Sequence, residues 1–226
     1  QLRGNQIVSG LALTMFGVGI TALFGRGMVG LTIKGFERVA IPGLSQLPII
    51  GKPFFNQDLL IYFSFLLVFG IAFFFARTRW GLALRTVGEN PAAADTCGVP
   101  VLLFRFLAVT IGSGIVGIGG AYLSLATTPM WIENMTAGRG WIAVALVIFA
   151  SWSSYRALAG AYLFGGITAM QLRFQAMGTT VSVHILQMLP YFFTILVLVI
   201  STIRLQKGAS QQPEGLGQPY DREDRK

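Results

Sequence analysis

Four apolar stretches, each close to the length of a membrane-spanning helix, constrain this sequence more than any other feature. They cover residues 7–24, 59–76, 102–126 and 185–203. A helix needs about 20 mostly apolar residues to cross the hydrocarbon core of a bilayer. Of the 226 residues, 54% are apolar and only 12% are charged, whereas soluble domains carry roughly 25% charged residues. The sequence therefore predicts an all-α integral membrane protein.

Two shorter apolar stretches, 139–153 and 157–172, lie on either side of a charged break at Arg156. The apolar core of each stretch is short. Each stretch could therefore be a tilted span, or the pair could form a re-entrant hairpin. Because the two stretches either both cross or both fail to cross, the C-terminus ends on the same side in each case. We expect six crossings in all.

The basic residues predict the orientation, because they concentrate on the cytoplasmic side of membrane proteins. With the loop 77–105, the C-terminal tail, Arg3 and Arg156 inside, 11 of the 17 Lys and Arg residues lie inside and 6 outside. The inside set is Arg3, Arg77, Arg79, Arg85, Arg105, Arg156, Arg204, Lys207, Arg222, Arg225 and Lys226. We therefore expect a multi-pass membrane protein with a cytoplasmic C-terminus.

Composition argues against several classes of function. One cysteine, Cys97, and one histidine, His184, supply neither a disulfide framework nor a Cys/His metal site. The basic residues lie between apolar runs instead of clustering on one soluble face, so nucleic acid is not the expected partner. Ionisable residues are almost absent from the spans, which disfavours a proton-driven carrier. Ser182 and His184 lie two residues apart and share no helix face, so they do not indicate an intramembrane enzyme.

The remaining segments divide into a loop and a tail. Residues 25–58 contain prolines and glycines between short apolar pieces, which predicts a folded cap on the outer membrane surface. Residues 208–226 are rich in Gln, Pro, Gly and charge, which predicts a disordered cytoplasmic tail after a permease domain at 1–207.

Small residues recur at helical spacing in two of the apolar stretches. Such faces let another helix backbone approach closely. They predict tight helix packing, the lining of a translocation path, or both. The residues are Gly112, Ser113, Gly117 and Ala121 in one stretch and Ala161 and Gly165 in the other.

The loop between the second and third long stretches contains the signals of a very short helix. Asn90 is a favourable N-cap and Pro91 fits the first helical position. Three alanines follow, and Gly98 supplies a stop. We expect a helix of about seven residues over 91–97, bounded by Gly88 on one side and Pro100 on the other. So short a helix is not stable alone in water, and it needs a docking surface.

The same residues resemble a known family. The pattern Gly81-x3-Arg85-x-Val-Gly-Glu-Asn-Pro-x-Ala-Ala-Asp95-x2-Gly98 resembles the cytoplasmic coupling segment of ABC-importer permeases of the branched-chain amino acid and simple-sugar superfamily. Further motifs, which resemble the nucleoside and simple-sugar branch, lie at 10–13, 41–51, 136–145, 163–166 and 188–191. Together they cover nearly the whole chain up to Arg204. Family members have additional N-terminal spans, so the resemblance implies the C-terminal portion of a longer permease. They usually have Gly and then Trp-x-Pro where this chain reads Ala150-Ser-Trp152-Ser-Ser154, so we expect a looser turn there.

The resemblance implies a set of partners for a transport subunit that is not itself an enzyme. They are a second permease subunit, ABC ATPase subunits that bind ATP and Mg, an external substrate-binding lipoprotein, and the lipid of a bacterial plasma membrane. The sequence agrees, because its only Gly-Lys pair is followed by Pro53 and so lacks the Ser or Thr of a P-loop. The residues expected to couple to the ATPase are Gly88, Glu89, Asn90, Pro91, Ala93, Ala94, Asp95 and Gly98.

A nucleoside or simple sugar is the substrate that the resemblance implies. Such a substrate needs hydrogen-bonding groups and an aromatic face, and the expected contacts are Thr110, Ser113, Trp131 and Asn134. Trp131 also fits a membrane-boundary anchor. Import of a branched-chain amino acid or another small polar solute is the alternative, and a structural anchor without transport is a more remote one.

Overall fold

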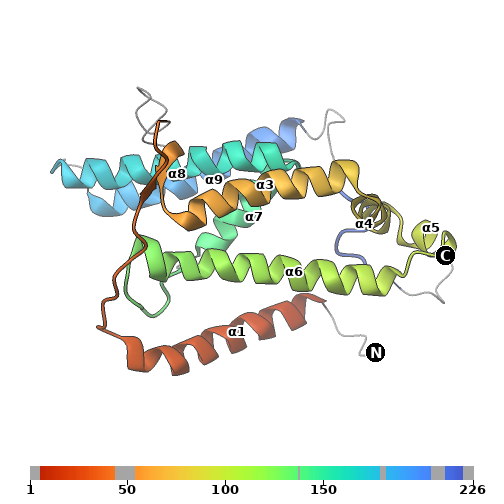
Figure 1. The fold of residues 1–226 in the computed structure, drawn as a ribbon, viewed down its shortest axis with the longest axis horizontal. Coiled ribbons are helices and arrows are strands. Elements are labelled where there is room, and N and C mark those ends of the chain that lie inside the picture. Colours follow the sequence, from red (N-terminus) through yellow and green to blue (C-terminus); the bar gives the residue numbers. More distant parts are fainter. Residues whose placement is uncertain (1–5, 44–53, 137, 179–181, 205–211, 221–226) are drawn as a thin grey trace. The chain divides into compact units, whose positions relative to one another are not determined.

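The structure is a computed structural model that describes residues 6–43, 54–136, 138–178, 182–204 and 212–220, and most of these residues are helical (Figure 1). Its longer helices are α1 (Gln6–Gly25), α3 (Leu59–Arg77), α4 (Arg79–Glu89), α6 (Val101–Tyr122), α7 (Arg139–Phe149), α8 (Ser154–Ala176) and α9 (Val183–Arg204). The shorter elements are η1 (Arg26–Met28), β1 (Val39–Ala40), β2 (Asn56–Gln57), α5 (Pro91–Thr96) and the π-helical η2 (Leu123–Thr127).

Five of the six apolar stretches predicted as spans are helical throughout, and the sixth, 139–153, is helical up to Phe149 and then turns. Among the described residues, three helices are long and apolar enough to cross a membrane: Val8–Met28, Leu59–Arg77 and Val101–Thr127. Only 6%, 0% and 6% of the residues in their apolar windows are buried inside the chain. Helices that expose so much apolar surface need lipid or other helices around them. The expected all-α membrane fold is confirmed.

The two shorter stretches form a helical hairpin with unequal arms. Helix α7 has 11 residues, or about 17 Å at 1.5 Å per residue, which is roughly half of the ~30 Å hydrocarbon core. Helix α8 has 23 residues and is about 34 Å long, so its length is enough to cross, but it is not among the three described helices that are also apolar enough. That all six helices cross the bilayer therefore stays a prediction, and α7 is the shortest of them.

The turn between α7 and α8 is closed by backbone hydrogen bonds, and that it is looser than the corresponding turn of the family it resembles stays a prediction. Ser151 and Trp152 both have positive φ angles, 47° and 57°. The Trp152 N–H donates to the carbonyl of Val147 at 3.3 Å, and the Ser153 N–H donates to that of Ala150 at 3.0 Å. Two left-handed residues reverse the chain without glycine or proline, at a cost of about 1–2 kcal/mol each.

The chain divides into two compact units, each of which has its own packing. The second unit comprises 67–89 and 138–216, and α7, α8 and α9 pack against one another in it (Figure 1). Gly160 of α8 lies against Leu146 and Phe149 of α7, where an added Cβ would come within 3.2–3.3 Å of their side chains. A glycine at this crossing lets the α7 side chains lie directly on the α8 backbone.

The first unit comprises 1–66, 90–137 and 217–226, and a cap covers one end of it. We use "cap" for the described loop residues 25–43 and 54–58. The Ile33 N–H donates to the carbonyl of Pro129 at 2.9 Å, and the Phe36 N–H donates to that of Leu125 at 3.3 Å. Strand β1 pairs with β2 in antiparallel register, Val39 opposite Gln57. The cap is therefore folded, as expected, and residues 44–53 of the same loop lie outside the described residues.

The predicted disordered tail at 208–226 is described only over 212–220. These nine residues form a turn and make hydrogen bonds with helices of the chain. Residues 208–211 and 221–226 lie outside the described ranges.

Candidate functional site

Helix α4 begins with a hydroxyl cap at Thr78. The Thr78 Oγ1 atom accepts a hydrogen bond from the Gly81 N–H at 3.0 Å and donates one to the carbonyl of Phe74 at 2.7 Å. The first N–H groups of a helix have no partner within the helix, so this hydroxyl satisfies one of them. A single side chain thus joins the end of α3 to the start of α4.

Glycine at position 81 makes the α3–α4 corner possible. A Cβ added there would overlap the backbone carbonyl of Phe74 and the Cα of Phe75. Backbone atoms cannot move aside as a flexible side chain can, so only glycine fits. Four residues later, the Arg85 guanidinium lies 5.7 Å from the centre of the Phe75 ring, a cation–π distance. The corner fixes where α4 starts, and α4 leads directly to α5.

Helix α5 starts as the sequence predicts. The Asn90 Oδ1 atom accepts a hydrogen bond from the Ala93 N–H at 2.9 Å, and Pro91 occupies the first helical turn. Proline at this position forfeits only an N–H that would lack a helical partner anyway. The N-cap is confirmed.

The end of α5 is also confirmed, because the chain turns at Gly98 with φ +80°. The Gly98 N–H donates to the carbonyl of Asp95 at 2.9 Å, and the Val99 N–H donates to that of Ala94 at 3.0 Å. This pair of bonds satisfies carbonyls at the helix end and needs a left-handed residue, for which glycine is best suited. Six residues thus form a helix with defined caps at both ends.

One side of α5 is buried and another is exposed. Ala94 is 3% exposed, Val101 at the start of α6 is 2% exposed, and α5 contacts α6. Ala92 and Ala93 are exposed. The helix is therefore seated on α6 through one alanine and presents two others outward. A small, smooth and pre-formed helical surface of this kind fits a groove on another protein.

Helix α4 was not predicted from the sequence, and Gly88 was expected at the edge of α5. Gly88 instead lies within α4, which ends at Glu89, so Asn90 alone separates the two helices. The sequence did contain a signal for α4. Thr78 is a capping residue, and Val87, which is buried, follows the half-buried Leu84 at helical spacing. The eight expected coupling residues, 88–91, 93–95 and 98, thus all lie within the segment from the last turn of α4 to the stop after α5.

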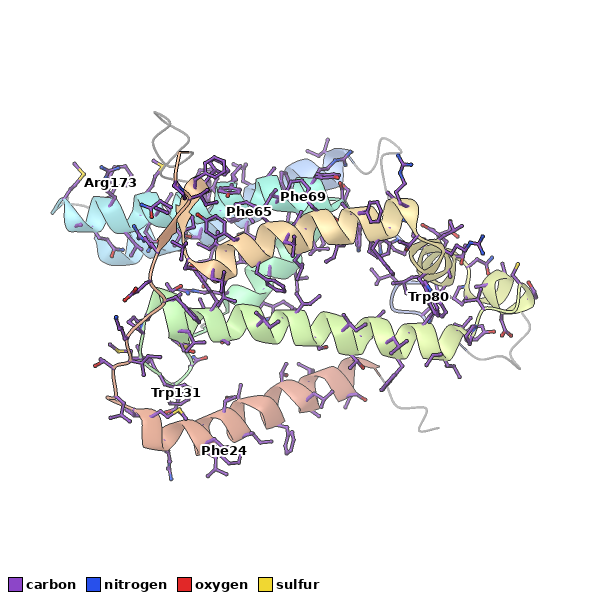
Figure 2. All side chains as sticks on the ribbon, in the orientation of Figure 1. Phe24, Phe65, Phe69, Trp80, Trp131 and Arg173 are labelled. Atoms are coloured by element: carbon purple, nitrogen blue, oxygen red, sulfur yellow. The ribbon has the colours of Figure 1, made fainter. Side chains whose placement is uncertain are left out.

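The four residues expected to contact the substrate do not form one site. Thr110 and Ser113 are exposed and one turn apart on α6. Trp131 and Asn134 follow η2, whose end lies 14 residues beyond Ser113, or about 21 Å along a helix. Figure 2 shows Trp131 beside the end of α1, where its ring leaves no room for a side chain at Gly25. The Trp131 ring therefore packs within the chain.

The small-residue faces expected to pack or to line a path are exposed in this chain. Gly112, Gly117 and Gly165 have nothing within 4 Å of an added Cβ. Ser113, Ala121 and Ala161 are exposed beside them. Within the second unit, α8 uses Gly160 and not Ala161 to contact α7. These faces remain open to another helix or to a solute, and the prediction that they have either role stays a prediction.

A buried carboxylate at the cap was not singled out from the sequence. Asp58 is 8% exposed, and its Oδ2 atom accepts a hydrogen bond from the Tyr122 hydroxyl at 2.8 Å. Its Oδ1 atom accepts one from the Ile61 N–H at 3.1 Å, which caps α3. Close by, the Tyr62 hydroxyl donates to the carbonyl of Val39 at 3.0 Å. The Asp58–Tyr122 bond thus holds the start of α3 to the end of α6, where η2 begins.

Comparison with known proteins identifies the family. The model for the permease component of branched-chain amino acid transport systems matches residues 1–203. A relative from Haloferax volcanii, provisionally named glucose ABC transporter permease protein TsgC13, is 42% identical over 98% of this chain and 74% of its own length. No solved structure matches the chain.

Two further relatives have names that include a substrate. The nucleoside ABC transporter permease protein NupC of Lactococcus lactis is 36% identical over 88% of this chain and 65% of its own length. The guanosine ABC transporter permease protein NupQ of Bacillus subtilis is 30% identical over 96% and 69%, respectively. The chain thus spans between 65% and 74% of the lengths of these three relatives. It belongs to the family of permease components of branched-chain amino acid transport systems, and it is a multi-pass membrane permease subunit.

Proposed function

We propose that this chain is the permease subunit of an ATP-driven importer that carries a nucleoside or a simple sugar. The three relatives named for glucose, nucleosides and guanosine support this substrate class. The description of the family names branched-chain amino acid transport, so branched-chain amino acids are the second candidate substrates. The C-terminus and α5 lie in the cytoplasm in this proposal, as the distribution of basic residues favours.

The observation that carries the proposal is the construction of α5. A six-residue helix with caps at both ends, seated by Ala94 and exposing Ala92 and Ala93, is a ready-made contact for a partner. One residue joins it to α4, and residues 97–100 join it to α6. A push on α5 is therefore transmitted to both neighbouring helices as a rigid-body movement. We assign the push to an ABC ATPase subunit, with Glu89 and Asp95 as polar contacts.

The other partners follow from the same proposal. The partner ATPase binds ATP and Mg, and this chain binds neither. A second permease subunit packs on the exposed glycine face of α6, around Gly112 and Gly117, where backbones can approach closely. An external lipoprotein delivers the substrate to the cap side. Thr110 and Ser113, on the same stretch of α6, supply hydroxyl groups to a sugar ring on the path.

Uptake of labelled solutes tests the proposal. A strain without this permease receives the full-length wild type, a variant with Ala93→Trp, or a variant with Leu66→Trp. Leu66 is 71% exposed on α3 and belongs to neither the cap nor α5, so its variant controls for added bulk. We expect the wild type and Leu66→Trp to restore uptake of guanosine or glucose, and Ala93→Trp to abolish it.

Three results would count against the proposal. If only leucine uptake is restored, the amino-acid alternative is correct. If no labelled solute responds to the wild type, the transport function is wrong. If Ala93→Trp transports as well as the wild type, α5 does not couple to the ATPase.

A further inference from the structure

Residues 212–220 contact both helices that flank α5 in the sequence. The segment begins with a turn in which the Leu216 N–H donates to the carbonyl of Pro213 at 3.1 Å. We call Gln212–Tyr220 the tail clip. Its first half belongs to the same compact unit as α4, and its second half to the same unit as α6.

The first half of the tail clip binds the last turn of α4. The Gly215 N–H donates to the carbonyl of Gly88 at 2.9 Å, and the Glu214 N–H lies 3.5 Å from the Glu89 carboxylate. The Pro213 ring lies 3.4 Å from the position that a Cβ of Gly88 would take. Carbonyls in the last turn of a helix lack helical partners, so the clip satisfies one of them. These contacts lie within two residues of Asn90, the N-cap of α5.

The second half of the tail clip binds α6. The Arg105 Nη1 atom donates to the carbonyl of Gln218 at 3.0 Å, and its guanidinium lies 5.9 Å from the centre of the Tyr220 ring. Gly217, between the two halves, has φ +76°, a left-handed conformation that glycine adopts readily. Arg105 is on the second turn of α6, directly after the joint with α5.

We propose that the tail clip strengthens binding of the ATPase subunit by ordering the segments that flank α5. This inference rests on the proposed function. Its first half orders the last turn of α4 and its second half orders the start of α6, each within its own unit, so that the chain enters and leaves α5 through ordered turns. Binding to a disordered segment carries an ordering cost that a pre-organised one avoids. The clip does not act as a plug, because Ala92 and Ala93 stay exposed while it is bound.

One substitution tests the first contact with a matched control. Gly215→Pro removes the N–H that donates to Gly88, whereas Gly215→Ala keeps it. The full-length permease, with its permease partner, is reconstituted in lipid nanodiscs, and the purified ATPase subunit is titrated in. One net hydrogen bond corresponds to roughly a two- to twelvefold change in an equilibrium, so we expect Gly215→Pro to weaken ATPase binding about fivefold. Gly215→Ala should bind as the wild type does.

A second variant ends the chain before Gln212 and removes both contacts, so it should weaken binding more than Gly215→Pro does. Equal affinities for the wild type and both clip variants would overturn the inference and leave the proposed function standing. Tighter binding or faster ATP hydrolysis without the clip would overturn it too, because the tail would then be inhibitory. If the wild type binds no ATPase, the proposed function fails first and this inference with it.

Discussion

The N-cap of α5 offers the sharpest test of how this small helix works. Asn90→Ala removes the 2.9 Å bond from the Ala93 N–H to the side chain. Loss of an N-cap costs about 1 kcal/mol, which is a factor of about five in an equilibrium. A helix of six residues has little stability of its own. Loss of the cap therefore shifts the equilibrium of α5 from the helical toward the frayed conformation. If a partner binds only the helical form, its affinity should fall up to about fivefold.

Two measurements check this value. Titration of the ATPase subunit into nanodiscs gives the affinity, and hydrogen exchange of the Ala93 amide gives the opening of the helix. Asn90→Ser and Asn90→Asp keep a capping oxygen and should behave like the wild type in both. Equal loss of affinity in all three variants would refute the reasoning, because the Asn90 side chain would then contact the partner itself. No change in Asn90→Ala would refute it as well.

The other predictions concern the α3–α4 corner and the cap. Gly81→Val places a side chain on the carbonyl of Phe74 and should cost at least about 1–3 kcal/mol, seen as a lower thermal unfolding temperature in detergent. Gly70→Val, on the preceding helix α3 with open space around it, should unfold near the wild-type temperature, and equal shifts in both variants would contradict the close contact. Tyr122→Phe removes a hydrogen bond to the buried Asp58 and should cost about 1–3 kcal/mol. It should also speed protease cleavage of the cap, and an unchanged cleavage rate would show that this bond does not hold the cap.

The parts of the fold that can be predicted from the sequence are those that depend on interactions between residues close together in the chain. Asn90, Pro91 and Gly98 act on backbone groups within five residues of themselves, so their types alone mark both ends of α5. The apolar stretches are equally local, because length and composition decide whether a helix suits a bilayer. Helix α4 could have been found in the same way, from Thr78 and the spacing of its apolar residues.

The rest depends on contacts between distant residues. Tyr122 and Asp58 are 64 positions apart, and neither residue type indicates the other as a partner. The Gly215 N–H donates to the carbonyl of Gly88, more than a hundred residues earlier in the chain, although the composition of the tail suggests disorder. Thr110 and Trp131 have suitable chemistry for a sugar or nucleoside, but α6 and η2 lie between them and place them at different positions along the helix axis.

Labelling of Cys97 tests the central claim, that α5 faces the cytoplasm and is held by an ATPase there. Cys97 is the only cysteine in the sequence, and it is exposed at the end of α5. A membrane-impermeant maleimide should label it in inside-out vesicles but not in right-side-out vesicles, and bound ATPase subunit should protect it. Cys97→Ala combined with Lys34→Cys should reverse the sidedness. Labelling of Cys97 in right-side-out vesicles, or equal labelling with and without the ATPase, would contradict the account.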